Sequence, residues 1–356
     1  MSERLSKIRN RMAKRRLDAL LVTDLGNIRY ASGFSGSAAV VVISLDRAVI
    51  FVDSRYTLQA REECPDFEVI QFKGDVFKAV GDLAKESNLS RIGYEAANVT
   101  CAKYRKIRSA VEKGRSLVSV QGLIEEVRQV KDAGEIAKLR KAAAITDDCF
   151  SYLVSHIEPG MTEKDVALDI YVFLVKNGAD KPAFDSIVAA GPHAAFPHAK
   201  PGDAVIQRGQ MLKMDFGASF EGYSADITRT IFIGEPDEKQ REVYNIVLEA
   251  QKAAIEAIRP GKTGKEIDAV ARDYIASHGY SEYFGHGLGH SLGIATHDGA
   301  LFAPTSELVL EPGMVMTVEP GIYIEGWGGV RIEDDILVTD SGVEILTKST
   351  KEIVVI

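Results

Sequence analysis

The second part of the chain contains two copies of one pattern, and this repeat limits the possible folds more than any other feature. Residues 157–166 (IEPGMTEKDV) resemble residues 258–267 (IRPGKTGKEI), 101 positions further along the chain. A helical pattern follows each copy and ends at Gly178 or Gly279, which keep the same offset. A period near 100 residues is too long for a solenoid. The repeat therefore predicts one α+β half-domain that occurs twice and faces itself across a pseudo-twofold axis.

Strand patterns continue both copies and carry acids. Residues 209–215 (GQMLKMD) correspond to residues 313–319 (GMVMTVE), at an offset of 104 positions, and a Pro-Gly pair then places the second acid at a strand end. A glycine-rich turn leads in each copy to a second strand pattern with one further acid. If the two halves face each other, four acids converge between them: Asp215, Asp226, Glu319 and Glu333. Buried carboxylates repel one another, and a bound multivalent cation removes that repulsion.

Each acid also has an ordinary structural explanation when it is taken alone. Asp215 ends an apolar strand pattern and could cap a turn, although Asp is depleted in strands. Asp226 could occupy an exposed strand position next to Arg229. Glu333 shares a strand face with Arg331 and could form a surface ion pair worth under about 1 kcal/mol. The metal site is favoured because the repeat sets these acids opposite one another.

Four of the seven histidines gather around the same pattern. His286 and His290 lie in the segment GHGLGHSLG, where the glycines disfavour a helix, and no H-E-x-x-H motif is present. In an extended segment, positions four apart share a face, so both side chains would point into one cavity. The alternative is a glycine-rich turn whose histidines face water. The nearby His297 and His198 favour a site, whereas His193 is predicted to lie in a loop.

The first third of the chain alternates short β-branched segments with helical periodicity. The strand patterns cover residues 19–22, 38–43, 48–52, 67–70 and 91–94. Residues 75–85 and 102–112 have apolar positions at helical spacing, so an α/β domain is predicted. Residues 124–141 are predicted to form one long charged helical stretch that contains the domain boundary. A length of 356 residues suits two domains, 1–130 and 131–356.

Composition excludes several classes of function. The net charge is −8, and the most basic stretch, residues 11–16, is predicted to be the solvated face of a helix, so no nucleic-acid partner is expected. The three cysteines, Cys64, Cys101 and Cys149, form no C-x-x-C pair, which indicates a reducing compartment. Residues 1–7 are charged, and no apolar run reaches the roughly 20 residues that span a bilayer. A cytoplasmic protein without a membrane partner is predicted.

These residues and their surroundings resemble the pita-bread metallopeptidases, in the proline-specific branch of aminopeptidase P and prolidase. The resemblance rests on the phrases DITRT, GHGLGH, VEPGIY and GGVRIED. It implies an α/β creatinase-like N-terminal domain followed by an α+β pita-bread catalytic domain made of duplicated halves. Methionine aminopeptidases share the catalytic fold but usually lack the first domain. Creatinase shares both domains but has lost the metal ligands, all of which are present here.

The resemblance implies a metal-ligand set of five residues. Asp215 would bind one ion, Asp226 would bridge or nearly bridge two, and His290 would cap one. Glu319 and Glu333 would complete the cage, with one carboxylate spanning the pair. Two divalent ions per subunit are therefore expected. Carboxylates with a single imidazole suit Mn²⁺ or Co²⁺, which we favour, and also accommodate Zn²⁺ or Fe²⁺.

The resemblance also implies residues that act on the substrate. Glu319 matches the general base of the family. His198, His286 and His297 match histidines that line the substrate pocket and stabilise the tetrahedral intermediate. Arg331 resembles an arginine that supports the site beside the last acid. The implied reaction is hydrolysis of a bond between any residue and proline.

The sequence favours an Xaa-Pro aminopeptidase over the alternative, an Xaa-Pro dipeptidase. Related prolidases often carry an arginine shortly after the histidine that matches His297, but residues 298–304 contain no basic side chain. The segments GFSGSA and VDSRYTLQA of the first domain are also more similar to aminopeptidase P. A homodimer built through the N-terminal domain is expected, and Arg55 of a partner subunit could bind a dipeptide carboxylate. A methionine aminopeptidase and an inactive peptidase-like binding module are weaker alternatives.

Overall fold

The computed structural model describes residues 3–356. Residues 1 and 2, which belong to the predicted N-terminal domain and to the predicted charged N-terminus, lie outside the described residues. The chain divides into two compact units, Met1–Arg128 and Gln129–Ile356. Among the described residues, no helix has both the length and the apolar character needed to cross a membrane.

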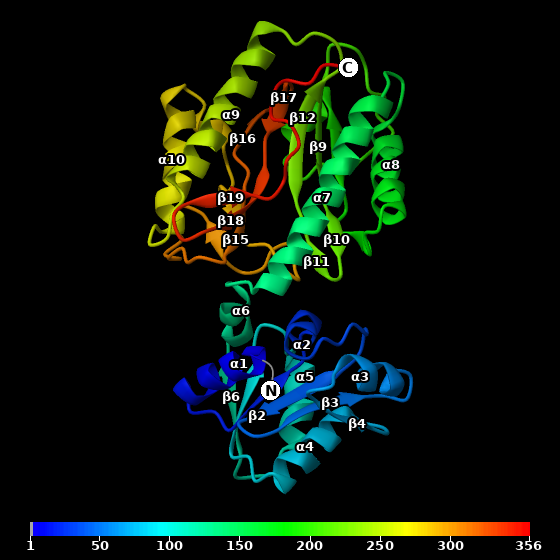
Figure 1. Ribbon diagram of the computed structural model, residues 1–356, viewed down its shortest axis with the longest axis vertical. Helices are drawn as coiled ribbons and strands as arrows, with labels where there is room; N and C mark the ends of the chain where they lie inside the picture. Colours follow the sequence, from blue (N-terminus) through cyan, green and yellow to red (C-terminus); the bar gives the residue numbers. More distant parts are fainter. Residues whose placement is uncertain (1–2) are drawn as a thin grey trace. The chain divides into compact units, whose positions relative to one another are not determined.

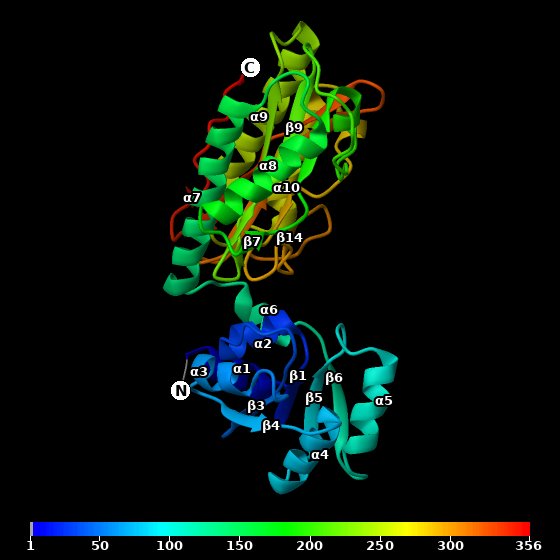
Figure 2. The same cartoon turned by 90° about the vertical axis from the view of Figure 1, so that its right-hand side faces the viewer.

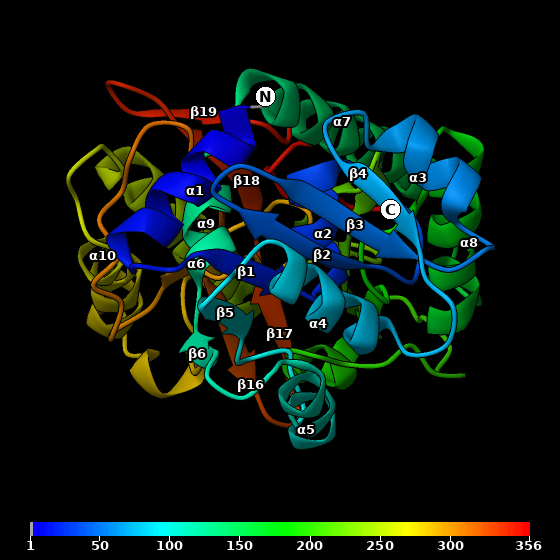
Figure 3. The ribbon, with the colours of Figure 1, turned by 90° about the horizontal axis from the view of Figure 1, so that it is seen from below.

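The first unit is a single mixed sheet with helices on both faces. Its strands are β1 (Ala19–Val22), β2 (Val40–Ser44), β3 (Ala48–Val52), β4 (Glu68–Gln71), β5 (Arg91–Glu95) and β6 (Ser116–Val120). Its helices are α1 (Glu3–Lys14), α2 (Leu25–Ser32), α3 (Thr57–Glu63), α4 (Val76–Glu86), α5 (Cys101–Ala110) and α6 (Leu123–Arg128). The strand order is β4-β3-β2-β1-β5-β6, which Figure 3 shows across the sheet. Only β2 runs antiparallel to its neighbours.

Strand alternation explains how this sheet is covered. Leu21, Val42 and Phe51 belong to the core beneath α4 and α5. The intervening strand residues point to the other face, where α1, α2 and α6 lie (Figure 1). Because both faces are covered, β1, β2 and β3 are nearly continuous apolar runs, as the sequence patterns indicated. The predicted α/β class of this unit is confirmed.

The second unit consists of two halves that each begin with two helices. The first half contains α7 (Ala133–His156), α8 (Glu163–Lys176), β7 (Lys181–Pro182), β8 (Ile187–Ala190), η1 (Gly191–Ala195), β9 (Met211–Phe216), β10 (Ala218–Phe220), β11 (Tyr223–Ser224) and β12 (Ile227–Phe232). The second contains α9 (Glu238–Ala257), α10 (Gly264–Ser277), η2 (Ser281–Tyr283), β13 (Gly289–His290), β14 (Leu301–Phe302), β15 (Val315–Val318), β16 (Gly321–Ile324), β17 (Gly328–Arg331), β18 (Asp334–Val338) and β19 (Val343–Ile345). The predicted duplication is confirmed.

The repeated Pro-Gly-x-Thr pattern produces the same helix start in both halves. Thr162 caps α8 and Thr263 caps α10, and each threonine forms a reciprocal capping box with the acid three residues later. Gly178 and Gly279 follow the two helices with φ of 98° and 85°. This left-handed conformation explains why glycine stands at both positions.

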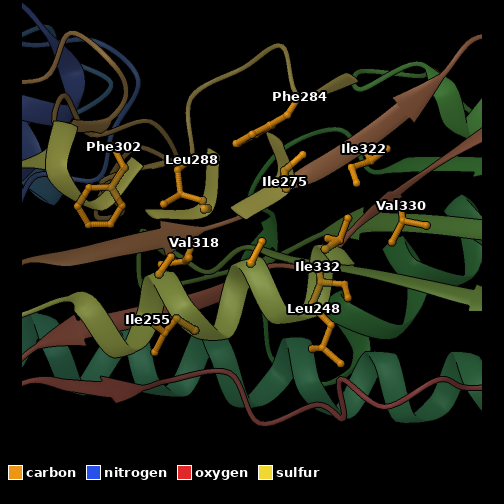
Figure 4. Close-up of a cluster of buried hydrophobic side chains, with 14 of the residues drawn as sticks. Leu248, Ile255, Ile275, Phe284, Leu288, Phe302, Val318, Ile322, Val330 and Ile332 are labelled. Carbon is orange, nitrogen blue, oxygen red and sulfur yellow. The ribbon is translucent and has the colours of Figure 1, made fainter. Parts of the chain in front are cut away.

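Each helix pair packs on the strands of its own half, as Figures 1 and 2 show. Side chains of α7 and α8 form one core with β8, β9 and β12. Side chains of α9 and α10 form another with β15, β16, β17 and β18. Figure 4 shows residues of this second core, among them Leu248 of α9, Ile275 of α10 and Val318 of β15. Each core packs the helices of one half against the strands of the same half.

One predicted helix is wrong. Residues 124–141 form the end of α6 and the start of α7, separated by the segment 129–132. Within this segment Val130 pairs with Met314, and the Lys131 amide donates to the Gly313 carbonyl. Asp132 then caps α7. The bridge between Val130 and Met314 and the N-cap at Asp132 interrupt the helix, although the sequence on both sides has helical periodicity.

Arg229→Met is expected to lower the free energy of unfolding by about 3–5 kcal/mol. Arg229 and Asp334 are both 1% exposed and form a 2.7 Å ion pair, and Arg229 also donates to the carbonyls of Ser349 and Thr350. Removing the guanidinium leaves the buried Asp334 carboxylate without its ion pair to Arg229. Urea denaturation measures the change. The matched control Arg140→Met removes an exposed pair with Glu344 and should cost under about 1 kcal/mol; equal costs would contradict the account.

Candidate metal centre

The second acid of each half lies in a two-residue break between strands, not inside a strand as predicted. Asp226 lies between β11 and β12, and Glu333 lies between β17 and β18. The Asp226 amide donates to Asp335 Oδ2 at 2.9 Å, and the Glu333 amide donates to the Thr228 carbonyl at 3.1 Å. These two hydrogen bonds from backbone amides join one half to the other. The breaks therefore bring the two acids together.

Asp226, His290 and Glu333 form a buried cluster in which the possible ligand atoms lie within 4.8 Å of one another. His290 belongs to β13, and its amide donates to Thr317 Oγ1 at 2.9 Å. Its Nδ1 faces the Ser291 carbonyl at 3.4 Å, which leaves Nε2 towards the acids. Burial, followed by the charge of His297, lowers the pKa of His290 to about 3. The imidazole is thus neutral, the form that binds metals.

The other two predicted ligands border the same cavity. Glu319 follows β15, and its Oε1 lies 3.4 Å from His290 Nε2 and accepts a 3.2 Å hydrogen bond from Thr317 Oγ1. Asp215 lies in β9, and its Oδ2 accepts a hydrogen bond from Arg331 Nη2. The cavity has a volume of about 1220 Å³, and all five predicted ligands line it.

The electrostatics of these acids fit a divalent cation. Burial, reinforced by like charges, raises the pKa values of Asp226 and Glu333 well above their ordinary values, and burial raises the pKa of Glu319 to about 7. One buried oxygen each of Asp215, Asp226 and Glu333 has no hydrogen-bond partner among residues 3–356. Buried acceptors without partners are costly. A cation offsets both the repulsion and the missing bonds, and oxygen ligands with one imidazole suit a divalent metal.

A second layer of residues contacts the five candidate ligands, and the sequence did not predict this layer. Thr228 Oγ1 donates to Glu333 Oε2 at 2.6 Å and accepts from Arg331 Nε at 3.0 Å. Thr317 plays a similar part between His290 and Glu319. Asp335 was also missed, although it lies two residues after Glu333 in a strand pattern. Such partners fix the rotamers of metal ligands.

The three predicted pocket histidines line the cavity but differ in their contacts. His286 Nδ1 donates to the Gly287 carbonyl and Nε2 accepts from the Tyr323 hydroxyl, both at 2.8 Å. Burial, followed by the charge of Arg331, lowers the pKa of His286 to about 4. His297 stacks on His290 with ring centroids 3.8 Å apart. Within the described chain, the ring nitrogens of His198 and His297 have no hydrogen-bond partner, so these two histidines can contact a ligand.

Arg331 connects the histidine side of the cavity with the acid side. Its Nη1 donates to the Tyr323 hydroxyl at 2.8 Å and to the Pro197 carbonyl at 3.2 Å, while Nη2 donates to Asp215. The Tyr323 hydroxyl in turn donates to His286. The guanidinium is buried and fully engaged, so it acts on the position of Asp215.

Two family models match the chain. Metallopeptidase family M24 matches residues 137–340, and the creatinase/prolidase N-terminal domain matches residues 4–130. The chain belongs to metallopeptidase family M24. The fold class given by the resemblance, a creatinase-type α/β domain followed by a pita-bread catalytic domain, is therefore confirmed, and the M24 chain is a metallopeptidase.

Solved structures and relatives of this M24 chain carry two kinds of name. It superimposes on an Xaa-Pro dipeptidase from Bacillus anthracis with a TM-score of 0.97 and 42% identity, covering 99% of both chains. It superimposes on an X-Pro aminopeptidase from Thermotoga maritima with a TM-score of 0.90 and 40% identity, covering 98% of this chain and 100% of the other. An Xaa-Pro dipeptidase from Pyrococcus furiosus is 38% identical over 99% of this chain and all of its own.

Proposed function

We propose that the protein is a metal-dependent exopeptidase that removes the first residue of peptides whose second residue is proline. The observation that carries this proposal is the set of five acidic and histidine ligands on the wall of one cavity of about 1220 Å³. The Xaa-Pro specificity is taken from the names of the relatives. Asp215, Asp226, His290, Glu319 and Glu333 would together hold two divalent ions, with Mn²⁺ or Co²⁺ favoured.

The chemistry that bound divalent ions supply at such a site is polarisation of a carbonyl and a nucleophilic water at neutral pH. Glu319 would accept a proton and pass it to the leaving proline nitrogen. Its Oε1 lies 3.4 Å from His290 Nε2 in the cavity wall, so the carboxylate stands beside the place where the ions and a water would be held. His198 and His297 would donate hydrogen bonds to the oxygen that becomes negative. Arg331, through Asp215, would keep the acid cage in place.

The proline ring requires a different kind of recognition from other residues. An Xaa-Pro amide has no N–H, so the site cannot hold that bond through a donated hydrogen bond. Phe184, Leu301 and Phe302 contribute apolar surface to the cavity. We propose that this surface packs against the ring of a trans Xaa-Pro bond, because isomerisation takes tens of seconds.

The aminopeptidase activity is favoured because the one arginine that the structure places in the cavity wall is already engaged and cannot serve to bind a dipeptide carboxylate. Arg331, which lines the cavity, already binds Asp215, Tyr323 and the Pro197 carbonyl. A dipeptidase is the second candidate. Lys181 and Lys200 also line the cavity, are exposed, and form no ion pair in the part of the chain that the structure describes. Either ammonium could bind the carboxylate of a dipeptide, as the dipeptidase names of two relatives suggest.

Hydrolysis of Leu-Pro-Pro-Gly is expected to exceed that of Leu-Pro at equal concentration with Mn²⁺ present. The measurement is the initial rate of leucine release from each peptide. Preference for Leu-Pro would replace the aminopeptidase with a dipeptidase. In that case Lys181→Met or Lys200→Met should raise KM for Leu-Pro and leave KM for the longer peptide unchanged.

Two other outcomes would indicate the weaker alternatives. Efficient cleavage of Met-Ala-Ser would indicate a methionine aminopeptidase, and no cleavage with metal bound would indicate an inactive binding module.

We further propose a domain boundary near residue 130. We also propose that the protein is cytoplasmic and forms a homodimer through its N-terminal domain. The three cysteines are free thiols, which supports a reducing compartment. Arg55 is exposed, and its Nη2 lies 2.8 Å from Asp53 Oδ2, so it is accessible to a partner subunit. Sedimentation equilibrium measures the oligomeric state. No nucleic-acid or membrane partner is proposed.

A further inference from the structure

The cavity wall that carries His198 has little regular structure of its own. Residues 190–202, here called the His198 segment, run from the end of β8 through the short turn η1 and an irregular stretch. Five consecutive residues of the segment line the cavity: Pro197, His198, Ala199, Lys200 and Pro201. No strand ladder holds this stretch, so its conformation depends on other partners for its backbone groups.

Glu163 binds both ends of the His198 segment. It is the first residue of α8, and its carboxylate is completely buried. Its Oε1 accepts from the Ala190 amide at 2.9 Å, and its Oε2 accepts from the Gly202 amide at 2.9 Å. His193 Nδ1 donates to the same carboxylate at 2.8 Å. One side chain thus joins the beginning, the turn and the end of the segment.

Lys213 binds the middle of the same segment. It lies in β9, and its side chain is completely buried. Its Nζ donates to the Ala194 carbonyl at 3.0 Å and to the Phe196 carbonyl at 2.7 Å. The Arg331 guanidinium takes the next carbonyl, that of Pro197, at 3.2 Å. Three neighbouring carbonyls therefore accept hydrogen bonds from two buried side chains.

These two polar side chains are costly to bury. The Lys213 amino group forms no ion pair within residues 3–356, and the strong partners of Glu163 are two amides and one imidazole. Burying a polar or charged side chain costs free energy that hydrogen bonds to backbone groups offset only in part. General stability therefore does not explain them. Their contacts concentrate on one segment, and that segment carries His198 into the cavity.

We propose that Glu163 and Lys213 are positioning residues that hold the His198 segment in the cavity wall. The contribution of His198 to hydrolysis rests on the proposed function, whereas the holding of the segment does not. Two measurements separate these parts. The first follows the segment directly, and the second follows its effect on turnover.

Hydrogen exchange of the full-length protein measures the segment without activity. In Glu163→Gln the new amide group faces hydrogen-bond donors, so at least one bond is lost. Peptides covering residues 190–202 should exchange at least about tenfold faster in Glu163→Gln and in Lys213→Met, while those of α9 stay unchanged. The control Glu158→Gln makes the same chemical change at an exposed position of the preceding loop and should leave exchange unchanged. Unchanged exchange of the segment in both variants would overturn the proposal.

A double-mutant cycle with His198→Ala measures the functional part. Glu163→Gln alone should lower kcat/KM for Leu-Pro-Pro-Gly by about 10–100-fold, because a displacement of about 1 Å of a group that acts on the substrate costs up to about 100-fold. In the His198→Ala background the same change should have little further effect, because the segment then has no histidine to position. Metal content should equal that of the wild type in every variant. Additive losses would overturn the functional part.

The outcomes distinguish this inference from the proposed function. If the wild type cleaves no Xaa-Pro peptide, the proposed function fails and hydrogen exchange still decides whether the segment is held. If Glu163→Gln does not fold, Lys213→Met replaces it in both measurements. If neither variant folds, the proposal is overturned, because the side chains of Glu163 and Lys213 then stabilise the whole second unit and not one segment.

Discussion

Glu319→Gln is expected to lower kcat for Leu-Pro-Pro-Gly by about 10²–10⁴-fold, the range lost when a general acid–base group is removed. The amide has the shape of the carboxyl group and can still accept the hydrogen bond from Thr317. It cannot take up a proton from water or pass one to the proline nitrogen. The loss should therefore appear mainly in kcat, with KM changed only a few-fold.

The test of Glu319 uses saturating Mn²⁺, because the residue is also a proposed ligand and its change weakens metal binding. Glu325→Gln is the matched control, since Glu325 is exposed on the turn between β16 and β17. This control should keep the kcat of the wild type. A Glu319→Gln protein with a kcat close to that of the wild type would refute the assigned role.

Asp226→Asn is expected to have opposite effects on stability with and without metal. In chelator the variant should melt at a higher temperature than the wild type, because it removes a carboxyl group whose burial, reinforced by nearby like charges, raises its pKa well above the ordinary value. With Mn²⁺ the order should reverse, since the wild type gains about 2.7 kcal/mol at a metal concentration of 100 Kd. The variant should gain little. Differential scanning fluorimetry with chelator and with Mn²⁺ measures both effects.

The loss of activity in Asp226→Asn should exceed the roughly 100-fold that changes to outer partners cost, because a direct ligand is removed. Asp340→Asn, at an exposed loop position, is the control and should respond to Mn²⁺ like the wild type. If chelated Asp226→Asn melted below the chelated wild type and still gained stability from Mn²⁺, Asp226 would be a structural residue and not a ligand.

The convergence of Asp215, Asp226, Glu319 and Glu333 on one cavity could be predicted, because the repeat supplies information that single residues do not. Asp215 is the last residue but one of β9, Glu319 directly follows β15, and Asp226 and Glu333 occupy matching breaks. The breaks themselves were missed, because the amide of Asp226 donates to a side chain 109 positions away. Such a partner is set by tertiary structure and leaves no local pattern.

Two strands of the first unit were predicted with the bounds that the structure has. β1 and β3 begin and end at the predicted residues, and every position in both is buried. The strand β6 was missed because its residues SLVSV are mostly exposed or half-buried. Edge strands carry a weaker apolar pattern, since only part of their surface is covered.

The positioning residues could not be predicted at all. His193 looked like an ordinary loop residue, and Glu163 looked like an acid in the first turn of a helix. Its carboxylate instead binds groups 27 to 39 positions further along the chain. Lys213 stands in an apolar strand pattern and gave no local signal, because its partners are backbone carbonyls.

The central claim is that these five ligands make a metal-dependent, proline-specific exopeptidase. The most direct measurement is leucine release from Leu-Pro-Pro-Gly and from Leu-Ala-Pro-Gly by protein dialysed against chelator, before and after addition of Mn²⁺. The account predicts release only after Mn²⁺ is added and only from the peptide with proline in the second position. Release that persists in chelator, or equal release from both peptides, would contradict it.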